Sequence, residues 1–154
     1  MIRITRETDY GFVLMTTMVR DANPPYSAAA LAKQRGLSLP MVSKILKALA
    51  RAGLLVSQRG AQGGYNLARP PAEISAADII DALEGPIAIT ACSADELPAC
   101  LHENHCTVSG HWHRINSAIR EALENISLLE MSRPPPLPIS FLREYAAVKS
   151  LQSL

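Results

Sequence analysis

Two short helical patterns joined by a tight turn, with a glycine-rich extended segment directly after them, constrain this 154-residue chain most strongly. The first pattern begins at Ser27, a favourable N-cap residue, and ends at Gly36. The second begins at Ser38, has Pro40 in its first turn and ends at Gly53. Its apolar residues recur at helical spacing: Val42, Ile45, Leu46 and Leu49. This layout predicts a helix-turn-helix.

The extended segment predicts a β-hairpin. Residues 54–57 and 65–67 are the expected strands, and the residues between them include three glycines. Such a turn adopts positive φ angles readily, so we expect a flexible tip that carries Arg59. A helix is expected from about Thr5 to Arg20 as well. Together these elements predict a winged helix-turn-helix domain over residues 1–70.

The remainder of the chain divides into three parts. Residues 71–106 contain a short helix from Ser75 to Glu84 and a segment with all three cysteines. Residues 107–132 are predicted to form one long dimerisation helix, and residues 133–154 form a proline-rich turn and a C-terminal tail. The long helix is indicated by an unbroken 3.5-residue repeat, which favours pairing with another helix: Val108, Trp112, Ile115, Ile119, Ala122, Ile126 and Leu129. The expected fold class is therefore mainly α with a small β-hairpin.

Charge is distributed unequally along the chain. The net charge is +1, but residues 1–70 have ten Lys and Arg against three acids, and residues 71–154 have five against eleven. A positive half of this kind attracts phosphates. Lys44, Lys47 and Arg51 recur at helical spacing opposite the apolar face of the second helix of the motif. This is the arrangement expected of a helix that lies in the major groove of double-stranded DNA.

Each candidate DNA-binding residue has an expected contact. The start of the second helix would reach base edges, Lys47 and Arg51 would contact phosphates, and Arg59 would enter a minor groove. The alternative is a basic face that binds something other than an operator, which would show as salt-dependent binding without sequence preference. The predicted set is Ser27, Ser38, Pro40, Met41, Ser43, Lys44, Lys47, Arg51 and Arg59.

The cysteines form a second candidate site. Cys92, Cys100 and Cys106 lie within fifteen residues and outside the expected core helices. Thiolates grouped in this way bind soft metals or iron–sulfur clusters. Structural zinc normally uses a pair of cysteines with two to four residues between them, and this pair is absent here, so zinc is the weaker alternative. A thiol redox sensor without metal, in which two cysteines pair on oxidation, is the other alternative.

Several classes of protein are disfavoured by the sequence. No apolar stretch approaches the length of a membrane span, and the N-terminus lacks a signal-peptide pattern, so we expect a cytoplasmic protein with no membrane partner. There is no activated-nucleophile arrangement, phosphate loop or carboxylate pair. An enzyme with a small-molecule substrate is therefore not expected.

These motifs together resemble the Rrf2 family of bacterial transcription regulators over nearly the whole chain. The matching stretches are residues 3–5 and 9–11, 36–54, 59–67 and 75–84, and the three-cysteine segment. Within the family, residues 85–90 and 113–123 are most similar to regulators of the SUF iron–sulfur assembly operon. The resemblance implies a homodimeric repressor whose paired long helices place two winged helices on a palindromic operator.

The resemblance also implies an iron–sulfur cluster held by Cys92, Cys100 and Cys106, with the 2Fe–2S type favoured over 4Fe–4S. Some relatives complete the ligand set with a histidine three residues after the third cysteine, and that position is Ser109 here. Others use an acidic residue from the first helix of the partner chain, which Asp9 matches.

Other residues remain open as the fourth ligand, namely Glu7, His105 and His111. Loss of such a cluster would change the angle between the two winged helices and so the fit to DNA.

Overall fold

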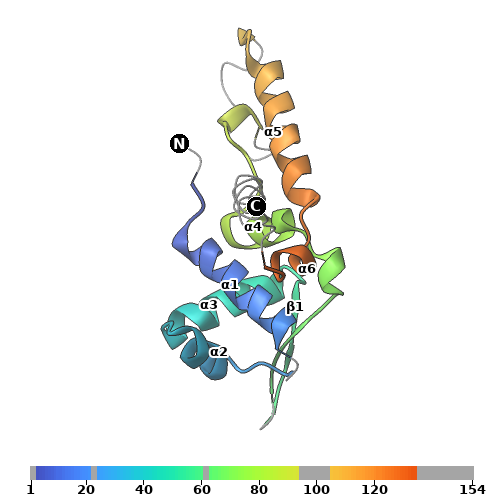
Figure 1. The fold of residues 1–154 in the computed structure, drawn as a ribbon. Coiled ribbons are helices and arrows are strands. Elements are labelled where there is room, and N and C mark those ends of the chain that lie inside the picture. Colours follow the sequence, from blue (N-terminus) through green and yellow to red (C-terminus); the bar gives the residue numbers. More distant parts are fainter. Residues whose placement is uncertain (1–2, 22–23, 61–62, 94–104, 135–154) are drawn as a thin grey trace, which may run out of the picture.

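The computed structural model describes residues 3–21, 24–60, 63–93 and 105–134. Figure 1 shows a body of packed helices and a two-stranded hairpin, from which α5 extends away. The elements in chain order are α1 (Arg6–Arg20), α2 (Ala28–Arg35), α3 (Leu39–Arg51), β1 (Leu55–Gln58), β2 (Gly64–Leu67), η1 (Pro71–Glu73), α4 (Ala76–Glu84), η2 (Ala91–Ser93), α5 (Ser109–Glu124) and α6 (Leu128–Met131). None of the helices in these ranges is long and apolar enough to cross a membrane.

The helix-turn-helix is confirmed, and both ends of α2 follow the expected cap chemistry. The Ser27 hydroxyl accepts a hydrogen bond from the Ala30 N–H at 3.1 Å at the start of α2. Gly36 ends α2 in the left-handed conformation, with φ of 65°, which glycine adopts at little cost. Ser38 occupies the N-cap of α3, but its side chain makes no cap hydrogen bond.

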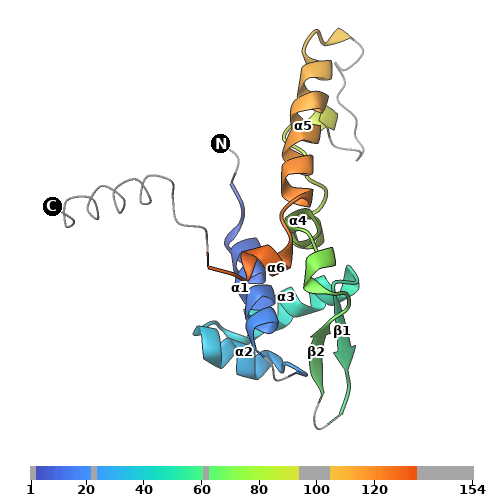
Figure 2. The same ribbon diagram turned by 45° about the vertical axis from the view of Figure 1, so that its right-hand side comes forward.

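The hairpin is confirmed as well. β1 and β2 are antiparallel, with Leu55 opposite Leu67 and Gln58 opposite Gly64. The chain between α1 and α2 attaches to this hairpin, because Tyr26 and Tyr65 exchange both backbone hydrogen bonds at 2.9 Å. In Figure 2 the hairpin projects from the end of the molecule opposite to the tip of α5.

The hydrophobic core lies where α1, α3 and α4 meet. Leu14 of α1, Ile45 and Leu49 of α3, and Ile79 of α4 are fully buried. The apolar stripe of α3 faces inward, so the opposite face of that helix is directed to solvent. The core therefore fixes which residues α3 exposes.

The prediction of one unbroken long helix was wrong at its C-terminal end. α5 stops at Glu124, and Ser127 caps the separate helix α6 by accepting a hydrogen bond from the Glu130 N–H at 3.2 Å. Leu128 is fully buried in the core, and its N–H donates to the Ile74 carbonyl at 2.7 Å. Ile126 and Leu129 continue the sequence repeat but do not lie on α5. Burial of Leu128 outweighs continuation of the repeat.

Candidate DNA interface and cysteine segment

The outer face of α3 carries the predicted basic residues. Lys44, Lys47 and Arg51 are all exposed, while the apolar residues on the opposite face are buried. Lys44 does not stand alone, because its Nζ lies 2.7 Å from Oε2 of Glu7 in the first turn of α1. Glu7, an alternative candidate for the fourth metal ligand, is therefore engaged in an ion pair with a candidate DNA-binding residue.

The N-terminus of α3 presents both hydroxyl and apolar groups to solvent. Ser38, Pro40 and Met41 are exposed, whereas Ser43 is half-buried. Leu39, which the sequence analysis did not single out, is 47% exposed. Its spacing from Val42 places it on the apolar stripe, but the helix begins at Leu39, at the edge of the core. A hydroxyl can bond a base edge, and an apolar side chain can contact a thymine methyl group.

Arg59 is exposed at the end of the hairpin, next to Gly60 with φ of 124°. The other two glycines of the turn are required for space. A Cβ on Gly63 would lie 2.4 Å from the Gln58 carbonyl oxygen, and a Cβ on Gly64 would lie 2.7 Å from that of Tyr26. The expectation of positive φ is therefore met at Gly60, and close backbone packing explains the other two.

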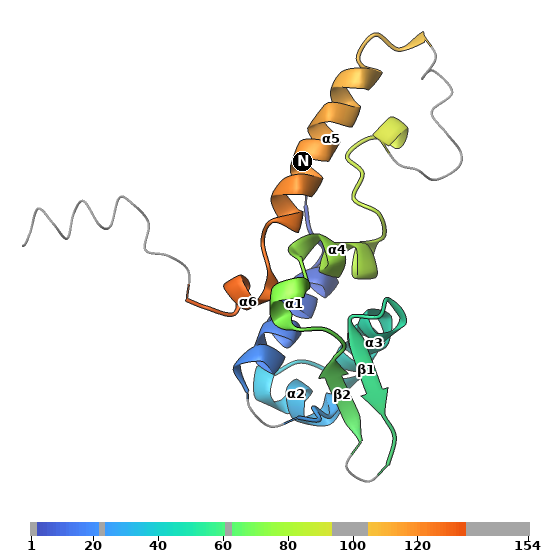
Figure 3. The same cartoon turned by 90° about the vertical axis from the view of Figure 1, so that its right-hand side faces the viewer.

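The cysteine segment is only partly described. Cys92 in η2 and Cys106 before α5 are free and half-buried, and Cys100 lies outside the described residues. The Cys92 Sγ lies 3.2 Å from Oγ1 of Thr90. The Ser109 hydroxyl, at the position where some relatives have a histidine ligand, donates to the Cys106 carbonyl at 3.1 Å. Figure 3 shows η2 beside α5, so the segment with Cys92 follows that helix.

The donor chemistry suits an iron–sulfur cluster, since the described cysteines are unbonded thiols with solvent access. Asp9, His105 and His111 are exposed, so each is open to a ligand from solvent or from another chain. Within the described part of one chain, no group of three or more His, Cys, Asp or Glu side chains is gathered around a metal position. A complete ligand set therefore needs residues outside the described ranges, such as Cys100, or a second chain.

Comparison with known proteins identifies the family. Residues 4–134 match the Rrf2 family, which is described as an iron-dependent transcriptional regulator. This chain belongs to the Rrf2 family. CymR of Bacillus subtilis is 33% identical over 132 residues, which cover 85% of this chain and 90% of CymR.

Solved structures agree with this Rrf2 assignment. The structure of B. subtilis CymR, titled the global cysteine regulator, has a TM-score of 0.63 at 30% identity and covers 86% of this chain and 97% of its own. The structure of T. potens IscR has a TM-score of 0.63 at 31% identity and covers 84% and 85%. The relatives are transcription regulators and not enzymes, so the predicted class of protein is confirmed.

One face of α5 in this Rrf2 regulator carries large apolar side chains without cover. Trp112 is 38% exposed and Ile115 is 43% exposed, and Val108 just before the helix is 48% exposed. Further along the same face of α5, Ile119 and Leu123 line a groove of about 690 Å³ together with residues of α4 and residues 85–89. Exposed apolar surface of this kind is typical of a contact with another protein chain.

The start of α1 in this Rrf2 regulator is attached to the end of α4. The Thr5 N–H donates to Oε1 of Glu84 at 2.8 Å, and this hydrogen bond lowers the pKa of Glu84 below its usual value. Thr5 is also the N-cap of α1, where it accepts a hydrogen bond from the Thr8 N–H at 3.2 Å. The first turn of α1, which contains Glu7 and Asp9, is thereby attached to the C-terminal end of α4.

Proposed function

We propose that this protein is a cytoplasmic homodimeric repressor of iron–sulfur assembly genes, whose affinity for a palindromic operator depends on a bound iron–sulfur cluster. The observation that carries the proposal is the placement of three cysteines between the DNA-binding domain and α5. Its family description as iron-dependent supports the same reading. A ligand held between these two parts can alter their relative orientation.

DNA binding is assigned to α3 and the hairpin. The exposed N-terminus of α3 would face base edges, and Lys47 and Arg51 would contact phosphates. Arg59 on the hairpin would enter the neighbouring minor groove. Lys44 would exchange its ion pair with Glu7 for a phosphate, because the Lys44 side chain is 70% exposed and an ion pair open to solvent is weak. Ser27 at the N-terminus of α2 would contact the DNA backbone.

Dimerisation is assigned to the exposed face of α5. Trp112 and Ile115 lie on this face, and covering them would remove apolar surface from water. A two-fold dimer presents its two recognition helices to a palindrome about one helical turn apart. The cluster would then act as a ligand with different affinity for two dimer geometries.

Cys92, Cys100 and Cys106 would hold the cluster, and Asp9 of the partner subunit would complete the ligand set. The cluster would supply a site that senses iron supply or oxidation, and we favour the 2Fe–2S type. Asp9 is exposed in the first turn of α1 and is therefore available to another chain. A carboxylate is a harder ligand than a thiolate, so the cluster would be comparatively labile.

The first test is anaerobic purification, followed by absorption spectroscopy and assays for iron and acid-labile sulfide. A coloured protein with equal iron and sulfide supports the proposal, and loss of both in Cys100→Ala would assign them to the cysteine segment. Asp9→Ala should leave the fold intact and shorten the lifetime of the cluster in air. An unchanged lifetime would move the fourth ligand to Glu7, His105 or His111.

The second test concerns the operator. Arg59→Ala should weaken operator binding and reduce discrimination near A·T-rich minor grooves, because an exposed arginine recognises a narrow minor groove. Electrophoretic mobility shifts on operators with altered flanking sequences would measure both effects. Equal affinity and equal discrimination would remove the hairpin from the interface.

A second candidate is a thiol- or zinc-dependent redox-responsive DNA-binding protein without an iron–sulfur cluster. This candidate is favoured by Cys92 and Cys106, which are free and accessible to solvent, and by similarity to CymR, the global cysteine regulator of B. subtilis. A colourless protein that resists cluster reconstitution, and whose operator affinity changes with oxidant or zinc, would support this candidate over the first.

A further inference from the structure

We propose that Asn116 is a positioning residue that ties the segment before Cys92, residues 87–89, to α5, while Asp81 ties the same segment to α4. The inference rests on the proposed function for its regulatory consequence, but its structural part does not. Residues 87–89 are the part of the chain through which Cys92 is attached to α4 and α5.

The side-chain amide of Asn116 binds the backbone of this segment at two points. Its Nδ2 donates to the Ile87 carbonyl at 3.0 Å, and its Oδ1 accepts from the Ile89 N–H at 3.2 Å. Residues 87–89 belong to no helix or strand, so these two backbone groups have no ladder of their own. The Asn116 amide therefore supplies the donor and the acceptor that a neighbouring strand would supply to this backbone in a sheet.

The same segment is also bound to α4. The Ile87 N–H donates to Oδ1 of Asp81 at 3.1 Å, and Oδ2 of Asp81 accepts from Nη2 of Arg120 at 2.9 Å. Asp81 thus links the segment to α4 and simultaneously pairs with α5. Asn116 of α5 therefore binds the segment directly, and Arg120, one turn further along α5, binds the Asp81 side chain that holds it.

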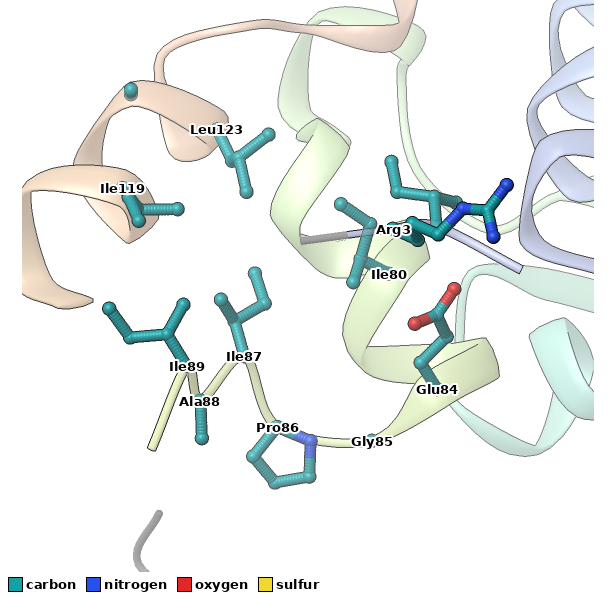
Figure 4. A pocket seen from close by; sticks show the side chains of 12 residues that line it. Arg3, Ile80, Glu84, Gly85, Pro86, Ile87, Ala88, Ile89, Ile119 and Leu123 are labelled. Carbon is teal, nitrogen blue, oxygen red and sulfur yellow. The ribbon is translucent and has the colours of Figure 1, made fainter. Parts of the chain in front are cut away.

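The side chains of the segment are directed to the same two helices. In Figure 4, Ile87 and Ile89 extend into the groove, where Ile119 and Leu123 of α5 lie opposite. The side chains of these two isoleucines line the groove, and an apolar lining sets no preferred position along it. The directional hydrogen bonds of Asn116 therefore set the position of the segment along α5.

Cys92 follows Ile89 by only three residues, and the intervening chain is folded into a tight turn. The Ser93 N–H donates to the Thr90 carbonyl at 3.0 Å, and the Thr90 hydroxyl contacts Sγ of Cys92 at 3.2 Å. Because these contacts close the turn, a shift of Ile89 would also move Cys92. Asn116 consequently determines where the first cysteine stands relative to α5.

The test uses amide hydrogen exchange on the full-length protein without any cluster. In Asn116→Ala, we expect the Ile89 N–H to exchange about fivefold to tenfold faster, the factor that corresponds to the loss of one net hydrogen bond. Asn116→Asp retains the acceptor for Ile89 and should keep most of its protection. Ser117→Ala is the matched control, because the Ser117 hydroxyl donates to the His113 carbonyl within α5 itself.

Unchanged exchange at Ile89 in Asn116→Ala would overturn the inference, as would uniformly faster exchange throughout α4 and α5, which indicates a general loss of stability. In the cluster-loaded protein, Asn116→Ala should also reduce the ratio of operator affinities between the loaded and cluster-free forms, whereas Ser117→Ala should not. If neither variant nor wild type ever holds a cluster while Ile89 responds as expected, the proposed function fails and the positioning role stands.

Discussion

The attachment of the hairpin to the α1–α2 connection can be tested by adding one methyl group, in Gly64→Ala. The new Cβ would lie 2.7 Å from the Tyr26 carbonyl oxygen, and ordinary contact begins at 3.4 Å. Tyr26 would have to retreat by about 0.7 Å, which stretches its two hydrogen bonds with Tyr65 from 2.9 Å beyond the useful range. Two net hydrogen bonds correspond to about 2 kcal/mol, within the range found for overpacking.

Urea unfolding of wild type and Gly64→Ala would measure this loss, and operator titration would show whether the displaced hairpin also weakens DNA binding. Gly110→Ala in α5 is the matched control, since a Cβ there meets nothing within 4 Å and alanine favours a helix by about 0.5–1 kcal/mol. If the free energy of unfolding of Gly64→Ala lies within about 0.5 kcal/mol of the wild-type value, the close approach of Gly64 to Tyr26 does not hold the hairpin in place.

Three further changes test other parts of the structure. Glu7→Gln should alter the free energy of unfolding by at most about 1 kcal/mol, because the Lys44 end of the ion pair is 70% exposed. The same change should increase the number of ions released on DNA binding, read from the salt dependence of the affinity, by up to about one. Leu128→Ala should cost about 2–5 kcal/mol in urea unfolding, since Leu128 is fully buried; a smaller loss would mean that α6 is not anchored in the core. Because the pKa of Glu84 is lowered, its bond to Thr5 stabilises the fold above the usual pKa of 4.5 and is lost as the pH falls through the lowered pKa. Urea midpoints measured across that range should decline less steeply in Glu84→Gln.

Local chemistry made the DNA-binding domain predictable from the sequence. Ser27, Gly36 and Ser38 mark helix boundaries by themselves, and the glycines around Arg59 require a turn. At the end of α5 two sequence signals compete. A 3.5-residue repeat continues through Leu129, whereas the Ser127 cap and the tertiary burial of Leu128 begin a separate helix.

In the candidate site as well, some features could be predicted from the sequence and others depend on tertiary contacts. Exposure of the basic face of α3 followed from its apolar stripe, because a buried stripe leaves the other side in water. The Glu7–Lys44 ion pair and the Asn116 contacts join residues far apart in the sequence, and no spacing rule indicates them. Leu39 was missed for a related reason, since periodicity alone does not show where the core ends.

α5 can act as a lever, because its C-terminal end is fixed to the core and its N-terminal end lies next to Cys106. Its base is held by Leu128 in the core, while its tip begins three residues after Cys106. Sixteen residues of helix span about 24 Å, so a displacement of about 2 Å at the tip rotates the axis by about 5°. In the proposed dimer, such a rotation would move the two winged helices relative to each other and so change the spacing of the half-sites that they fit. An operator whose half-sites are moved apart by a single base pair would therefore respond to the cysteine segment differently from the native one.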